Sequence, residues 1–166
     1  LDGEYYCQMF AREGRLQTTA LRYFNVFGPR QDPKSQYAAA VPIFIARAVK
    51  NEPIRIYGDG EQTRDFIYVK DIAAVNAFFA VQSPRSGEVF NVAYGGKITI
   101  NELAATIRRL TGSRSGITHA PERAGDVKHS MAAVDKLRGA GFTPADSLAS
   151  GLQTTIEFFQ RKIREG

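Results

Sequence analysis

Near the start of the chain, a strand-like run passes abruptly into a Gly-Pro turn. The segment Gln17–Phe24 is rich in β-branched and aromatic side chains, which predicts a strand. Asn25 follows directly, and Gly28 and Pro29 then break the run. In an α/β protein, ligands bind outside the carboxyl ends of strands, where Asn25 could offer both a donor and an acceptor. The same residues would also suit a buried strand followed by an ordinary turn.

The rest of the chain alternates between helical and strand-like segments. The expected helices are 4–11, 38–51, 72–81, 102–110, 132–138 and 147–164, and the expected strands are 17–24, 54–57, 64–69, 88–93, 98–100 and 117–120. Asp71 and Asn101 each stand at the start of a helical pattern, so we expect them to be helix caps. This alternation predicts an α/β layered fold.

The composition is that of a globular protein with a sizeable core: 166 residues, 43% hydrophobic and 23% charged. No apolar run is long enough to span a bilayer, and the single Cys7 suits a reducing compartment, so we expect a cytoplasmic protein without membrane contact. The net charge of +5 suits a polyanionic partner, but the dispersed basic residues make nucleic acid the weaker choice. His119 and His129 lack the spacing of a metal site, so we expect no metal.

Three longer blocks together resemble one known family. They are Arg22–Gln31 (RYFNVFGPRQ), Gly58–Asp71 (GDGEQTRDFIYVKD) and Arg123–Ser130 (RAGDVKHS). In this order they resemble the extended short-chain dehydrogenase/reductase (SDR) family of NAD-dependent nucleotide-sugar epimerases and dehydratases, in particular its 4-epimerases of UDP-hexoses and UDP-N-acetylhexosamines. The resemblance covers essentially the whole chain. It implies an α/β protein that is the C-terminal part of an extended Rossmann-type fold, mostly the smaller substrate-binding domain.

The resemblance also implies a domain division. Residues 1–36 would be a residual helix and strand of the Rossmann domain, and residues 37–166 would be the substrate-binding domain. Residues 64–95 would pack back toward the rest of the Rossmann half. The full-length enzyme would be a homodimer that oxidises the sugar at C4, lets the 4-keto sugar rotate and reduces it on its other face.

Two motifs of the family do not occur in this sequence. There is no glycine-rich strand-to-helix turn for NAD, and Tyr5 and Tyr6 are not followed by a Lys four residues later. Residues 1–4 resemble the positions just after that Lys. We therefore expect the chain to begin downstream of the catalytic motif, to contain no catalytic residue, to leave NAD mainly to an N-terminal half, and to be inactive alone.

The resemblance assigns the phosphate and cofactor contacts to particular side chains. Arg64 and Arg123 would hold the diphosphate, because a guanidinium matches phosphate oxygens bidentately. Asp126 would bind a ribose hydroxyl or hold its own loop in place. Asn25 would contact a substrate phosphate, and Phe24 would lie near the nicotinamide of NAD, although an isolated Phe on a strand also suits the core.

Further residues would contact the sugar and the base. Gln31 and Ala39 would line the sugar pocket, and Tyr57 would flank the uracil ring. Ser130 occupies a position where relatives restricted to glucose and galactose carry Tyr, so its smaller side chain would admit an N-acetyl group. Such steric room discriminates by only ~1–3 kcal/mol and does not exclude plain hexoses. Ser130 could equally be the start of the next strand.

Other functions fit the same residues. A 4,6-dehydratase or a decarboxylase of the same family shares these blocks, and product analysis would separate them from an epimerase. A non-catalytic nucleotide- or RNA-binding module is a further alternative, and salt-sensitive RNA binding would favour it. An interaction protein that uses an exposed half-interface would associate without ligand.

Overall fold

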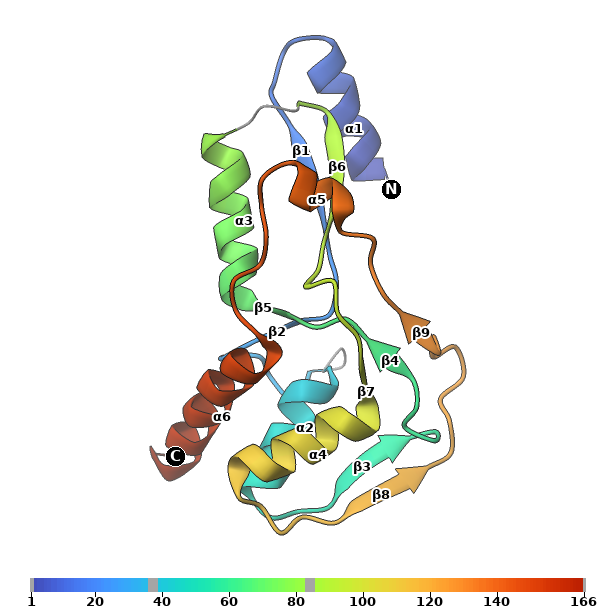
Figure 1. Ribbon diagram of the computed structural model, residues 1–166, viewed down its shortest axis with the longest axis vertical. Coiled ribbons are helices and arrows are strands. Elements are labelled where there is room, and N and C mark those ends of the chain that lie inside the picture. Colours follow the sequence, from blue (N-terminus) through green and yellow to red (C-terminus); the bar gives the residue numbers. More distant parts are fainter. Residues whose placement is uncertain (1, 36–38, 83–85, 166) are drawn as a thin grey trace.

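Two large clusters of buried apolar side chains lie one above the other along the long axis of the molecule (Figure 1). The structure, a computed structural model, describes residues 2–35, 39–82 and 86–165. The expected helix start at Ala38 and the expected domain boundary between residues 36 and 37 lie outside these ranges.

The upper cluster surrounds a parallel strand pair. Strand β1 (Thr19–Tyr23) runs parallel to β6 (Glu88–Val92). Parallel neighbours need a crossover connection, and the chain between them contains helix α3 (Val69–Val81). The short helix α5 (Asp135–Gly139) contacts β6. The buried side chains of this cluster are Ile67, Val75, Phe79, Phe90, Val92 and Leu137.

Helix α1 (Asp2–Arg12) lies beside β1 at the upper end of the molecule (Figure 1). A bidentate ion pair connects them, since Arg22 Nε and Nη2 each lie 2.6 Å from a carboxylate oxygen of Glu4. No residue of this helix is buried, and Tyr5 and Tyr6 are more than 60% exposed. The aromatic side chains of α1 therefore contribute little to the core of the described chain.

The lower cluster is built mainly from helices α2 (Ala40–Val49), α4 (Ile100–Thr111) and α6 (Leu148–Glu165), which contact one another. A parallel pair of strands, β3 (Ile54–Tyr57) and β8 (Ile117–Ala120), borders α4. The apolar stripes of these helices face inward, as the 3.6-residue spacing of their apolar residues predicts. Most of the large buried side chains of the molecule belong to this cluster.

Short strands join the two clusters at the waist of the molecule (Figure 1). Strand β2 (Val26–Phe27) pairs with β5 (Ile67–Tyr68), and β4 (Thr63–Arg64) lies between β7 (Ile98–Thr99) and β9 (His129–Ser130). These strands bring the first, second and third sequence blocks next to one another.

Two expected helix caps are wrong. Asp71 lies inside the first turn of α3, where its buried carboxylate accepts hydrogen bonds from the backbone N–H groups of Ala145 (2.8 Å) and Asp146 (3.3 Å). Asn101 lies inside α4, and its amide donates to the carbonyl oxygen of Asp59 at 3.0 Å. In both cases a partner distant in sequence uses the polar group that would otherwise serve as the cap.

The expected strand 64–69 is interrupted, because β4 ends at Arg64 and β5 begins at Ile67. The two halves have different partners: β4 pairs with β7 and β9, whereas β5 pairs with β2. The helix expected at 132–138 is observed as α5, which begins at Asp135 and ends at Gly139. Other element ends differ from the expectation by a few residues.

Thr99 is the cap of helix α4. Its side chain accepts a hydrogen bond from the Glu102 N–H at 3.1 Å, and Glu102 accepts one from the Thr99 N–H at 2.9 Å, which forms a capping box. Hydrogen bonding to the Glu102 carboxylate, first from the backbone N–H of Thr99, holds the pKa of Glu102 below its usual value. This stabilisation is therefore present at neutral pH and is lost as the pH falls through that lowered pKa.

The Thr99→Ala variant is expected to unfold about 1 kcal/mol more easily, because the first turn of α4 loses one of its acceptors. Urea denaturation followed by circular dichroism would measure the loss. Thr154→Ala, on the exposed face of α6, is the matched control and is expected to change stability by less than about 0.5 kcal/mol. Equal stability of the two variants would contradict the capping role.

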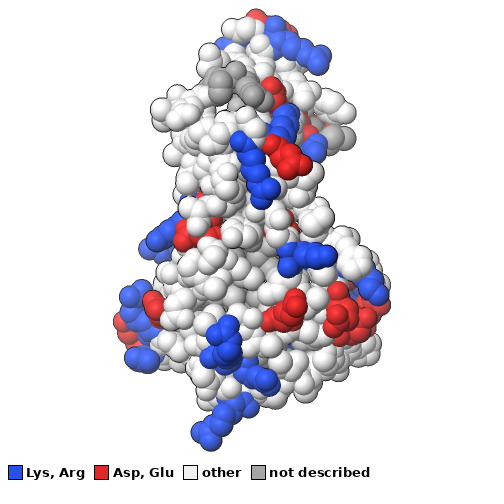
Figure 2. All heavy atoms as spheres, viewed as in Figure 1, with Lys and Arg blue, Asp and Glu red and all other residues white. Residues whose placement is uncertain are grey.

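Charges are spread over the face shown in Figure 2, where Lys and Arg are interspersed with Asp and Glu along the length of the molecule. This distribution agrees with the dispersed basic residues of the sequence. None of the helices among the described residues is long and apolar enough to cross a membrane.

Candidate functional site

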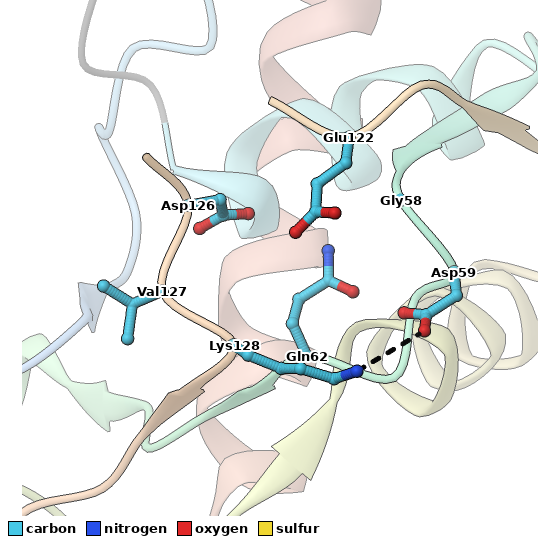
Figure 3. Close-up of a pocket in the computed structure, with 7 residues that line it drawn as sticks. All are labelled: Gly58, Asp59, Gln62, Glu122, Asp126, Val127 and Lys128. Atoms are coloured by element: carbon cyan, nitrogen blue, oxygen red, sulfur yellow. Dashed lines mark ion pairs between the residues drawn. The ribbon is translucent and has the colours of Figure 1, made fainter. Parts of the chain in front are cut away.

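A pocket of about 160 Å³ lies between the turn after β3 and the segment that leads to β9 (Figure 3). Its lining residues are Gly58, Asp59, Gln62, Glu122, Asp126, Val127 and Lys128. An ion pair of 4.0 Å between Lys128 and Asp59 connects its two sides. The turn needs glycine at Gly60, whose φ is +78°, because a Cβ there would lie 2.1 Å from the side chain of Asn101.

Arg64 lies beside this pocket and is held from two sides. Its side chain is only 14% exposed, and its Nη1 donates to the carbonyl oxygen of Thr63 at 2.9 Å. Its Nη2 forms an ion pair with the carboxylate of Asp126. Ser130 is the register partner of Arg64 between β9 and β4. The fold thus brings together Arg64, Asp126 and Ser130, although the first is more than sixty residues from the others in sequence.

Arg123 and Tyr57 form the second contact across the pocket region. The guanidinium carbon of Arg123 lies 3.8 Å from the centre of the Tyr57 ring, which is a cation–π contact. Hydrogen bonding and the positive charge of Arg123 lower the pKa of the Tyr57 phenol. The two arginines therefore have different protein partners, and their convergence on one diphosphate stays a prediction.

Removing the Arg123 side chain should change the titration of the Tyr57 phenol. In Arg123→Met the pKa of Tyr57 is expected to rise, because the cation that stabilises the phenolate is gone. Tyrosine ring carbons followed by NMR as the pH is raised would measure it, with Tyr57→Phe to assign the signal. Arg114→Met is the control and is expected to leave the titration unchanged, and an unchanged pKa in Arg123→Met would contradict the contact.

Gln62 is a pocket residue that the sequence analysis missed. Its Nε2 donates to the carbonyl oxygen of Tyr57 at 2.7 Å, and its buried Oε1 has no hydrogen-bond partner among the described residues. Asp59, Glu122 and Lys128 were also missed. The sequence blocks that carried the family resemblance contain Gln62, Asp59 and Lys128, so their place in these blocks could have indicated them. Glu122 lies just before the third block, and no sequence signal indicated it.

The lining of the pocket is acidic, because Asp59, Glu122 and Asp126 outnumber the single cation Lys128. Carboxylates accept hydrogen bonds, so the pocket suits hydroxyl or N–H groups better than a phosphate. A phosphate would be favoured at the edge, next to Arg64 and Arg123. The arrangement therefore suits a ligand with a hydroxyl-rich part joined to an anionic part.

Asn25 lies near Arg64 but outside the pocket lining. It has an unusual φ of +32°, and its Nδ2 donates to the carbonyl oxygen of Asp65 at 2.9 Å. The half-buried Phe24 packs against a small cluster of Ala93, Ala132 and Val134, as expected for a core residue. Its role near a nicotinamide stays a prediction.

The two expected sugar-pocket residues also lie outside the lining of this pocket. Gln31 donates its amide to the carbonyl oxygen of Val26 at 3.4 Å, and its buried Oε1 has no partner among the described residues. Ala39 is the residue before the first turn of α2. Their assignment to the sugar stays a prediction. Within the described ranges, no three His, Cys, Asp or Glu side chains group as metal ligands.

The fold is closely similar to solved sugar-nucleotide epimerases. The UDP-N-acetylglucosamine 4-epimerase of Methanobrevibacter ruminantium, solved with UDP-N-acetylmuramic acid, is 42% identical with a TM-score of 0.90, over 97% of this chain and 52% of that one. The UDP-glucose 4-epimerase of Thermotoga maritima, solved with UDP-glucose, is 38% identical with a TM-score of 0.90, over 98% and 52%. These similarities define the chain as an α/β protein of the Rossmann-type SDR class.

Sequence comparison narrows the class to a family. The family model described as "NAD dependent epimerase/dehydratase family" matches residues 1–93. A UDP-N-acetyl-alpha-D-glucosaminuronate decarboxylase of Bacillus cytotoxicus is 36% identical over 95% of this chain and 50% of its own length. The chain belongs to the NAD-dependent epimerase/dehydratase family, and it spans about half the length of the curated relatives it matches.

Proposed function

We propose that this chain is the nucleotide-sugar-binding half of an NAD-dependent 4-epimerase that acts on a UDP-hexose or a UDP-N-acetylhexosamine. The observation that carries the proposal is the pairing of Arg64 with Asp126 beside an acidic pocket, with Tyr57 and Arg123 nearby. A nucleotide sugar contains the groups that such a site would bind: hydroxyls, an aromatic base and a diphosphate.

Each group of the ligand would have a matching side chain. Arg64 and Arg123 would bind the diphosphate, because each presents a fork of N–H donors. The Asp126 carboxylate would accept a ribose hydroxyl, and the ring of Tyr57 would stack on the base. Asn25 would add a donor to a phosphate oxygen from the end of β1.

Ser130 is proposed to set the breadth of sugar specificity. Its position opposite Arg64 in the β4–β9 pair supports a place near the sugar-phosphate end of the ligand. A Ser side chain leaves room that a Tyr would fill, so an N-acetyl group could be accommodated. Gln31 and Ala39 are proposed to line the same sugar.

The described residues do not by themselves fit the whole NAD molecule. In these ranges β5 runs directly into α3 and β7 directly into α4, with no glycine turn at either junction to hold a pyrophosphate. Phe24, at the end of β1, is the residue of this chain proposed to lie near the nicotinamide. NAD would be bound mainly by an N-terminal half.

The division of the protein is also proposed. Residues 1–36 would belong to the Rossmann domain, residues 37–166 to the substrate-binding domain, and residues 64–95 would pack against the Rossmann half. The pairing of β1 with β6 and the exposed aromatic side chains of α1 support further protein packing on the upper part. The full-length enzyme would be a cytoplasmic homodimer.

A second candidate is a nucleotide-sugar decarboxylase, favoured by the Bacillus cytotoxicus relative. A 4,6-dehydratase of the same family is a third. Product analysis of the full-length enzyme with UDP-N-acetylglucosamine and UDP-glucuronic acid distinguishes them, since epimerisation keeps every atom of the sugar, decarboxylation releases carbon dioxide and 4,6-dehydration releases water.

Calorimetric titration of the purified chain with UDP, UDP-N-acetylglucosamine and UDP-glucose tests the binding function. We expect UDP and both sugar nucleotides to bind, and inorganic phosphate or a single-stranded RNA to bind at least tenfold more weakly. With added NAD the chain alone should not epimerise either sugar. Preference for RNA, with strong salt dependence, would contradict the proposal.

A further inference from the structure

Asp65 is a buried carboxylate at the centre of the segments that carry the candidate site. It lies in the break between β4 and β5, and it is 1% exposed. Because neighbouring residues of an extended chain point to opposite sides, Arg64 reaches Asp126 while Asp65 faces the interior. Burying a carboxylate costs free energy unless hydrogen bonds compensate for the lost water. The hydrogen-bond partners of Asp65 therefore indicate the structural role of this residue.

The carboxylate of Asp65 holds the connection between β6 and β7 by its backbone. Its Oδ2 accepts a hydrogen bond from the N–H of Gly95 at 3.0 Å. Burial raises the pKa of this carboxyl, and the nearby backbone N–H groups, above all that of Gly95, counteract the rise. Gly95 belongs to this connection, and Ala93 in the same connection packs with Ala132, which follows Ser130 by two residues.

The backbone of Asp65 holds a further segment. Its carbonyl oxygen accepts the hydrogen bond from Asn25 Nδ2 at 2.9 Å. The φ of +32° at Asn25 is rarely adopted by a non-glycine residue and persists where the surroundings hold it. Asp65 thus contacts the end of β1 and the β6–β7 connection, and that connection packs against the chain just after β9.

We propose that Asp65 is the positioning residue of this site, which fixes where Asn25 lies and, through the β6–β7 connection, where the segment from Asp126 to Ser130 lies relative to Arg64. What the site binds rests on the proposed function, but the positioning does not. Oδ1 of Asp65 has no hydrogen-bond partner among the described residues. The observed 3.0 Å hydrogen bond from Gly95 therefore needs only one acceptor oxygen, Oδ2. An asparagine can supply that oxygen and place its amide where Oδ1 now lies.

The chain offers a matched control in Asp71. It too is a buried carboxylate, 3% exposed, that accepts hydrogen bonds from two backbone N–H groups, those of Ala145 and Asp146. However, it connects α3 to the segment before α6 rather than to the site. Comparing the two positions separates an effect on the site from a general loss of stability.

The test compares Asp65→Ala, Asp65→Asn and Asp71→Ala by calorimetric titration with UDP, at a temperature where circular dichroism shows each variant folded. Asp65→Ala is expected to bind UDP at least tenfold more weakly than the unaltered chain. Asp71→Ala should stay within twofold and Asp65→Asn within threefold. Wild-type affinity in Asp65→Ala, or an equal loss in Asp71→Ala, would overturn the proposal.

The affinity of Asp65→Asn for UDP and the amide exchange of residues 123–130 test the positioning role if the first comparison fails. If Asp65→Ala does not fold, Asp65→Asn decides, because a tenfold loss there would assign the effect to charge and not to positioning. If the unaltered chain does not bind UDP, the proposed function fails, and backbone amide exchange of residues 123–130 then tests the positioning. Faster exchange is expected in Asp65→Ala and not in Asp71→Ala, and equal rates would overturn it.

Discussion

Replacing Arg64 with methionine is expected to lower the affinity of the chain for UDP by about 10- to 100-fold. A hydrogen-bonded contact between a charged side chain and its partner is worth about 1.5–3 kcal/mol, and each 1.4 kcal/mol is tenfold in affinity. Methionine keeps the apolar length of the side chain and removes only the guanidinium. Asp126 is then left unpaired, but its side chain is 34% exposed and water can solvate it.

Calorimetric titration with UDP measures the loss, and two variants serve as controls. Arg64→Lys keeps the charge but not the planar fork, so its affinity should lie between those of the unaltered chain and Arg64→Met. Arg108→Met removes an exposed arginine on α4 and should leave the affinity unchanged. If Arg64→Met bound UDP as tightly as the unaltered chain, Arg64 would not bind the diphosphate.

Phe27→Ala is expected to reduce the free energy of unfolding by about 3–5 kcal/mol, the usual cost of deleting a buried aromatic ring. Phe27 is 1% exposed in β2, at the waist of the molecule. Its ring packs edge-on against Phe66, with 6.3 Å between the ring centres, and lies 5.6 Å from the ring of Tyr68. The α6 residue Gly151 packs so closely there that an added Cβ would lie 2.8 Å from Phe27.

Urea denaturation monitored by circular dichroism gives this value directly. Tyr6→Ala removes an aromatic ring that is 63% exposed on α1 and should change stability by less than about 0.5 kcal/mol. If Phe27→Ala cost no more than Tyr6→Ala, the waist would not depend on this ring for its stability.

The waist matters for the site as well as for stability. Arg64 in β4 is the register partner of Ser130 in β9. Asp65, the next residue, accepts a hydrogen bond from Gly95 in the β6–β7 connection. Only Asp65 separates Phe66 from Arg64 in the sequence. A change in the packing of Phe27 against Phe66 is therefore expected to move Arg64 as well. We expect stability and ligand affinity to be coupled at this point of the molecule.

Several elements could be predicted from sequence because local chemistry decides them. The strand Ile54–Tyr57 was predicted with its observed ends, since alternating β-branched residues stand between Pro53 and the glycine turn. The second and third sequence blocks contain Arg64, Asp126 and Ser130, which were predicted to contact the ligand. The structure brings these three residues together, and their contacts with the ligand stay a prediction.

The helix caps were decided by tertiary partners. Asp71 and Asn101 have the residue types that cap helices, and the local pattern cannot show whether a distant group will bind them instead. The partner of Asp71 is the backbone at Ala145, 74 residues away. The division of strand 64–69 into β4 and β5 has the same cause, because each half follows its own partner strands.

The sequence alone determined the family and the α/β class and predicted residues of the candidate site, because these depend on local patterns and on motif blocks. Only the tertiary structure decided which groups are partners: Arg64 with Asp126, Arg123 with Tyr57, and Asp65 with the backbone of Gly95. Each of these contacts joins segments at least thirty residues apart. Such contacts form only when the whole chain packs its apolar side chains together, so no local pattern encodes them.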